Sequence, residues 1–120
     1  MILNMFHLNI NQWFVGHENW TNYASSVYQN WDLCMIAGGM SVGILTDNVT
    51  IYNQAINWVF DGTGNGQIKH AIPFTYFYDN ELSAQPMEAG WDQGHTMLDI
   101  VLLGVIGQTS WNQGLDIFWI

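Results

Sequence analysis

Residues 84–95 read Ala84-Gln85-Pro86-Met87-Glu88-Ala89-Gly90-Trp91-Asp92-Gln93-Gly94-His95. The part from Glu88 onward brings two carboxylates, an amide and an imidazole together in a chain that has few charges elsewhere. If a helix begins near Gly90, the side chains of Asp92, His95 and Asp99 fall on one helix face, and Glu88 lies just before it. We therefore take this stretch as the centre around which the rest of the chain is organised.

The proximity of a carboxylate to His95 has two interpretations. A carboxylate beside an imidazole can orient the ring and fix its tautomer, which prepares the ring to act as a general base. Alternatively, His95 is a structural helix residue that is hydrogen-bonded to its own neighbours, since structural ion pairs also involve histidines. The spacing alone leaves both interpretations open.

The composition restricts the partners that this protein can bind. The chain has 120 residues, which suits one domain or part of one, and 49% of them are hydrophobic, so a buried core can form. Ten acidic residues accompany one cation, Lys69, and the net charge is −9. Nucleic acid and anionic membranes are excluded as partners, because phosphate binding requires Lys and Arg. No zinc-type Cys/His spacing exists, and the glycine-rich run 61–66 lacks the Lys-Ser/Thr of a phosphate loop, so neither a zinc site nor a cofactor is predicted.

Apolar residues recur at helical spacing in two segments of the first half of the chain. Steps of three and four over 21–45, and again over 48–60, predict two helices. The break Thr46-Asp47-Asn48 separates them, and Asn48 is placed to cap the second helix. Residues 21–61 are therefore expected to form a helical hairpin, after an irregular lead-in over 1–20.

The second half is expected to repeat this arrangement. A loop is predicted over 62–89, in which residues 68–78 could hold a short strand or an extended segment, and a third helix follows over 91–107. Thr109 or Ser110 would cap a brief fourth helix through Trp119, so that residues 90–120 form a second helical hairpin. The sequence thus predicts a single all-α domain of antiparallel helical hairpins.

Four segments of the chain occur in an order that is more specific than any one of them. They are 30–34 (Asn-Trp-Asp-Leu-Cys), 61–68 (Asp-Gly-Thr-Gly-Asn-Gly-Gln-Ile), 85–95 (Gln-x-x-Glu-x-Gly-x-Asp-Gln-Gly-His) and 111–118 (Trp-Asn-Gln-Gly-Leu-Asp-Ile-Phe). Together they resemble the alginate lyase family of polysaccharide lyases, over about residues 17–118.

This resemblance implies a fold, a reaction and a ligand. The family's fold is an (α/α) toroid of stacked helical hairpins, of which this chain would form a part. Because two hairpins cannot close a ring, their exposed apolar faces would need a partner, and self-association is expected. The implied reaction is β-elimination on a uronic-acid polysaccharide or oligosaccharide, and the family favours a secreted or extracellular location.

The resemblance also implies roles for individual residues. Asn30 matches an asparagine that neutralises the substrate carboxylate, and His95 matches the histidine that acts in proton transfer. The implied orienting groups and sugar contacts are Glu88, Trp91, Asp92 and Gln93. The family's second motif normally has an arginine where this chain has Trp91, so the usual clamp for a carboxylate is missing. For the tyrosine acid of such lyases, Tyr76 and Tyr78 are merely near in sequence.

Two alternatives to a lyase follow from the same residues. The first is a catalytically inactive helical module that self-associates or binds carbohydrate, because cations are nearly absent and aromatic side chains are the usual surfaces for stacking sugars. The second is a site for a hard divalent ion. Its ligands would be Glu88, Asp92, His95 and Asp99.

Overall fold

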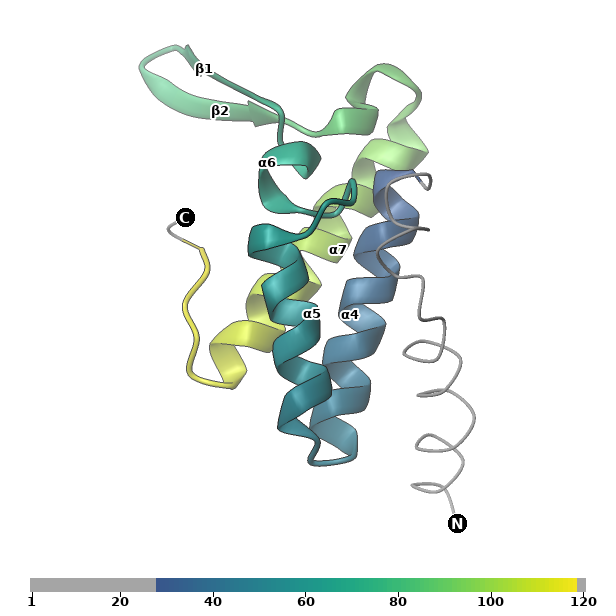
Figure 1. Ribbon diagram of the computed structural model, residues 1–120. Helices are drawn as coiled ribbons and strands as arrows, with labels where there is room; N and C mark the ends of the chain where they lie inside the picture. Colours follow the sequence, from purple (N-terminus) through teal and green to yellow (C-terminus); the bar gives the residue numbers. More distant parts are fainter. Residues whose placement is uncertain (1–27, 119–120) are drawn as a thin grey trace.

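The described part of the chain contains three long helices, two short ones and a β-hairpin, arranged as in Figure 1. The computed structural model describes residues 28–118. In chain order the elements are α4 (Gln29–Leu45), α5 (Val49–Asp61), α6 (Ile68–Ala71), β1 (Phe74–Tyr78), β2 (Glu81–Gln85), the 3-10 helix η2 (Met87–Gly90) and α7 (Gln93–Asn112). The expected lead-in over 1–20 and the expected helix start at Thr21 lie outside the described residues.

α4 and α5 form an antiparallel pair joined by a tight turn. α4 begins at Gln29, because Tyr28 has extended backbone dihedrals. The predicted cap of the second helix is confirmed: Oδ1 of Asn48 accepts hydrogen bonds from the backbone N–H groups of Thr50 and Ile51 at 3.1 and 3.2 Å. These bonds satisfy two of the donors that a helix start leaves unpaired, so the turn and the first residues of α5 are fixed together.

The hydrophobic core lies where α4 packs against both α5 and α7. Its buried members are Leu33, Ile36 and Met40 of α4, Ala55, Ile56 and Val59 of α5, and Ile106 of α7. Burying one such aliphatic side chain contributes about 1.5–3 kcal/mol. α4 is therefore the central helix, and each of its neighbours depends on it for a buried face.

The carboxylate of Asp32 connects α4 to the glycine-rich loop that follows α5. This side chain is fully buried. Its Oδ2 accepts the backbone N–H of Gly66 at 2.6 Å, and its two oxygens lie 3.2 and 3.3 Å from Nε1 of Trp58. Burial raises the pKa of Asp32 above its ordinary value, and the hydrogen bonds from Gly66 and Trp58 act in the opposite direction. The loop is thus held against α4 by a buried polar contact.

The side chain of Gln67 continues this loop into α6. Its Nε2 donates to the carbonyl oxygen of Phe60 at 2.7 Å, and its Oε1 accepts the backbone N–H groups of Lys69 and His70. The end of α5 and the start of α6 are joined in this way, so the run 61–68 is a structural connection with defined hydrogen bonds.

The all-α prediction is wrong, because residues 74–85 form a two-stranded antiparallel sheet. Asp79 and Asn80 connect its strands with φ values of 51° and 65°. Two positive φ angles in a two-residue connection are typical of the turns that suit the twist of a hairpin. β1 consists of aromatic and β-branched residues, which favour strands. The segment expected to be a loop over 62–89 therefore contains α6, the hairpin and η2.

The expected fourth helix is also absent from the described residues, and no second helical hairpin forms. α7 continues through Ser110, whose Oγ donates to the carbonyl oxygen of Ile106 at 2.9 Å instead of capping a new helix. The helix ends before Gly114, which has a φ of 86° and allows the left-handed turn common at helix ends. The chain then folds back, so that the ring of Phe118 covers Gly107. The described helices accordingly do not form the toroid-like pair of hairpins.

Substituting Gly66 tests the contact between the loop and α4. A Cβ at this position would lie 2.8 Å from Cδ1 of Ile36 and 3.0 Å from the carboxyl carbon of Asp32, so Gly66→Ala should lower the free energy of unfolding by about 1–3 kcal/mol. Gly104→Ala is the matched control, because its Cβ would meet nothing within 4 Å. In the exposed helix interior it should raise stability by about 0.5–1 kcal/mol. Urea unfolding of both variants measures this, and equal effects would contradict the packing described.

Candidate functional site

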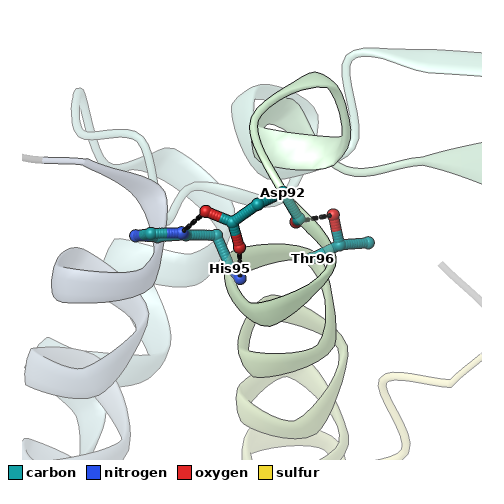
Figure 2. A network of polar contacts seen from close by, with 3 residues as sticks. All are labelled: Asp92, His95 and Thr96. Carbon is teal, nitrogen blue, oxygen red and sulfur yellow. Dashed lines mark hydrogen bonds and ion pairs between the residues drawn. The ribbon is translucent and has the colours of Figure 1, made fainter.

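Asp92 caps α7 and holds the imidazole of His95 (Figure 2). Oδ1 of Asp92 accepts the backbone N–H of His95 at 2.9 Å, and Oδ2 lies 2.6 Å from Nδ1 of the ring. The hydroxyl of Thr96 donates to the carbonyl oxygen of Asp92 at 2.9 Å. The pairing of a carboxylate with His95 expected from the sequence is therefore present, and it results directly from the helix cap.

This contact sets the tautomer of His95. An ionised carboxylate can only accept, so Nδ1 carries the proton and Nε2 keeps its lone pair in the neutral ring. The hydrogen bonds from the backbone N–H and the ring of His95 lower the pKa of Asp92, which keeps this carboxylate ionised. The His95 side chain is 38% exposed. The basic nitrogen thus belongs to a partly exposed ring of fixed orientation.

Two exposed aromatic rings lie beside the imidazole. The ring centroids of Trp91 and His95 are 5.2 Å apart in an edge-to-face arrangement, and the ring of Tyr28 lies 4.6 Å from that of Trp91. Tyr28 and Trp91 are 56% and 57% exposed. The contact from Tyr28 brings the start of α4 to the start of α7, so the surface around His95 is formed by two helices.

A buried pair of carboxyl groups lies behind this surface. Asp99 of α7 and Glu88 of η2 are 0% and 5% exposed, and their carboxyl oxygens have no hydrogen-bond partner among the other described residues. Burial, together with the charge and the carboxyl group of Glu88, raises the pKa of Asp99 to about 7, while the charge of His95 acts in the opposite direction. The carboxyl group of Asp99 therefore keeps its proton at pH values where an ordinary aspartate is ionised.

The remaining predicted residues occupy different environments. Asn30 lies in the first turn of α4, is 5% exposed, and has an Oδ1 atom without a hydrogen-bond partner among the described residues. Its neighbour Gln29 is fully buried, and both polar atoms of its amide are likewise unpaired. Gln93 is the first residue of α7 and is exposed. Tyr76 and Tyr78 lie on β1, which projects away from the helices (Figure 1).

The structure therefore brings some of the predicted residues together and separates others. Trp91, Asp92 and His95 are in contact, whereas Glu88 is turned into the interior against Asp99. Asn30 lies at the same end of α4 as Tyr28, in the first turn of that helix. Sequence reasoning missed Tyr28, because its contact with Trp91 joins residues that are far apart along the chain and have no common spacing.

The proposed site for a divalent ion does not form. Within residues 28–118 no group of three or more His, Cys, Asp or Glu side chains could hold a metal. The reason is that Glu88 and Asp99 point inward while Asp92 is exposed. Among the helices of the same residues, none is both long enough and apolar enough to cross a membrane.

Comparisons with known proteins give no neighbour: no family model, no curated protein and no solved structure matches the chain.

The buried carboxyl pair predicts an unusual dependence of stability on pH. In the folded state Asp99 keeps its proton up to about pH 7, whereas its ordinary pKa is 3.8. The folded state then binds more protons than the unfolded state, so stability should fall as the pH rises through this window. Asp99→Asn should remove the fall and raise the free energy of unfolding at about pH 7.5 by at least ~1.4 kcal/mol, which corresponds to one pKa unit.

The control is Asp61→Asn, which removes an exposed carboxylate at the end of α5. Thermal unfolding of both variants should be recorded at about pH 4 and about pH 7.5, values on either side of the shifted titration. Stabilisation by Asp99→Asn that is equal at both pH values, or that Asp61→Asn reproduces, would show that Asp99 titrates normally.

Proposed function

We propose that the surface formed by Tyr28, Trp91 and His95 is the substrate site of a polysaccharide lyase that acts on a uronic-acid polymer. The observation that carries this proposal is the contact between Asp92 and Nδ1 of His95, because it leaves Nε2 of a partly exposed ring as a base of fixed orientation. The ordered motifs that resemble the alginate lyase family support the same reaction.

His95 and Asp92 have separate roles in this reaction. Nε2 of His95 removes the proton at C5 of the uronic-acid unit, the electron pair of that C–H bond forms the C4=C5 double bond, and the C4–O bond breaks. The glycosidic oxygen takes a proton from water as it leaves, and the hydroxide that results neutralises the imidazolium of His95. Asp92 stabilises the imidazolium that results, and so lowers the cost of the first transfer.

The aromatic rings and the amide of Asn30 suit the rest of the substrate. Trp91 and Tyr28 offer exposed ring faces on which a sugar ring can stack. Asn30 lies in the first turn of α4, two residues after Tyr28, and a buried amide can donate hydrogen bonds to a carboxylate where water is excluded. Gln93 is exposed at the start of α7, close enough in sequence to Asp92 to contact a bound sugar.

Removing the imidazole tests this proposal. His95→Ala should reduce the rate of double-bond formation from a uronic-acid polymer by about 100-fold or more, because a positioned base contributes ~10²–10⁴ in rate. The measurement is the ultraviolet absorbance of the C4=C5 double bond. His70→Ala is the matched control, since His70 lies on α6 and its Nδ1 contacts Gly64. Wild-type activity in His95→Ala, or no activity in the wild type on any uronic-acid polymer, would refute the lyase.

A gain of function can be measured in the same assay. Trp91→Arg places a cation beside His95, where it can form a bidentate pair with a substrate carboxylate. It should raise kcat/KM on a uronic-acid polymer by about tenfold, the equivalent of ~1.4 kcal/mol. A decrease equal to that of Trp91→Ala would mean that the ring of Trp91 matters more than the charge of the substrate.

A second candidate function, a self-associating helical module, is favoured by the exposed face of α7. Met97, Val101 and Val105 follow one another at steps of four along this helix and are 52%, 54% and 43% exposed. Apolar side chains at this spacing form one stripe, and such stripes on soluble proteins commonly mark contacts with other chains.

Light scattering of the purified chain tests this candidate. The wild type should form a dimer or a larger assembly, and Val101→Lys should shift it to the monomer by placing a charge in the stripe. Gln108→Lys, at another exposed position of α7, should leave the assembly intact. A wild type that is monomeric at all concentrations would remove self-association from the account.

A further inference from the structure

The β-hairpin presents aromatic side chains that the rest of the molecule does not cover. It projects from the helices near α6 (Figure 1), and every residue of β1 is exposed. Phe74, Tyr76 and Tyr78 are 62%, 49% and 73% exposed. Neither the core nor the surface around His95 uses these rings, so their exposure requires a separate explanation.

The strand register arranges the three rings in a line, each opposite a polar side chain. Phe74, Tyr76 and Tyr78 alternate along β1 and therefore lie on one face of the sheet. Their cross-strand partners on that face are Gln85, Ser83 and Glu81. The opposite face has a different character, because there Phe77 pairs with Leu82 and Thr75 with Ala84.

A ladder of this kind has the chemistry of a sugar-binding surface. Successive rings on one face are about 6.8 Å apart, twice the rise per strand residue. Ring faces bind the C–H surfaces of pyranose rings, while an amide, a hydroxyl or a carboxylate beside each ring can form hydrogen bonds with sugar hydroxyl groups. Apolar surface with a few placed polar groups is the usual composition of sites for small polar molecules.

The negative charge of the hairpin favours neutral carbohydrates over anionic ones. Its charged residues are Asp79 and Glu81, and the single cation of the chain, Lys69, lies on α6. A polyanion would therefore meet repulsion without any compensating cation. A neutral sugar chain meets no such penalty, and the carboxylate of Glu81 can accept hydrogen bonds from its hydroxyl groups.

The size of this face does not suit a protein partner. Two five-residue strands cover about 17 Å by 10 Å. Such an area is far below the roughly 800 Å² per partner that a stable protein interface requires. It is large enough for a short run of sugar units, which bind by a few stacked rings instead of by a broad buried area.

We propose that the face formed by Phe74, Tyr76 and Tyr78 with their partners Gln85, Ser83 and Glu81 binds neutral pyranose units of a polysaccharide. This site is separate from the reaction proposed at His95 and does not depend on it. β2 leads through Pro86 into η2 and then to Trp91, so the two proposed sites lie on one continuous stretch of the chain.

Affinity electrophoresis of the full chain tests the proposal. The gels contain a soluble neutral polymer (a β-glucan or a galactomannan) or, in a separate arm, polymannuronate. The wild type should be retarded by at least one neutral polymer. Tyr76→Ala removes the central ring and should weaken this binding about tenfold. Phe77→Ala is the matched control, because it removes an aromatic ring that is 78% exposed on the opposite face, and it should bind like the wild type.

Several results would overturn the proposal. They are the absence of binding to every neutral polymer, stronger binding to polymannuronate than to the neutral polymers, and equal losses in Tyr76→Ala and Phe77→Ala. A dimer in light scattering that Tyr76→Ala dissociates would assign the face to a second copy of the chain instead. His95→Ala should bind neutral polymers normally, so failure of the lyase and failure of this site give different results.

Discussion

The contact between the buried carboxylate of Asp32 and the loop after α5 is the constraint on which the remaining architecture depends. Asp32 lies on the central helix α4 and binds both the backbone of Gly66 and the indole of Trp58. A buried carboxylate is costly unless it is hydrogen-bonded, so the loop can pass α4 only where these donors reach it. The loop path then sets the start of α6, from which the hairpin, η2 and α7 follow. The first two motifs of the lyase-like pattern, 30–34 and 61–68, therefore contact each other for a structural reason.

The helices of the first half could be predicted from local signals, while the second half depends on longer-range contacts. The helical spacing over 48–60 and the cap at Asn48 act within a few residues, and both are found in the structure. The hairpin also has a local signal, since aromatic residues precede Asp79-Asn80, a pair that adopts positive φ angles in the turn. The end of α7 cannot be predicted from the residues next to it in the sequence. Ser110 caps no new helix, since its Oγ donates to the carbonyl oxygen of Ile106. Phe118 folds back over Gly107, a contact between segments that only the folded chain brings together.

The candidate site shows the same division. The pairing of Asp92 with His95 was predictable, because an acid three residues before a histidine at a helix start reaches both its backbone N–H and its ring. The buried position of Glu88 is not predictable from the sequence, since it depends on how η2 packs against α7. Helical spacing places Asp99 on the same face as Asp92, whereas in the structure Asp99 is buried beside Glu88. Tyr28 enters the site through packing between the starts of α4 and α7. A sequence pattern identifies groups that interact within one turn of a helix. Burial, and the residues that a second helix adds to a site, depend on tertiary structure.

The central claim of this account is that Asp92 holds the neutral ring of His95 with Nε2 unprotonated. The most direct measurement is the ¹⁵N NMR spectrum of the His95 ring in the wild type and in Asp92→Asn, at a pH where the imidazole is neutral. The account predicts a proton on Nδ1 and a lone pair on Nε2 in the wild type, with a mixture of tautomers once the carboxylate is removed. A proton on Nε2 in the wild type, or the same spectrum in both proteins, would contradict it.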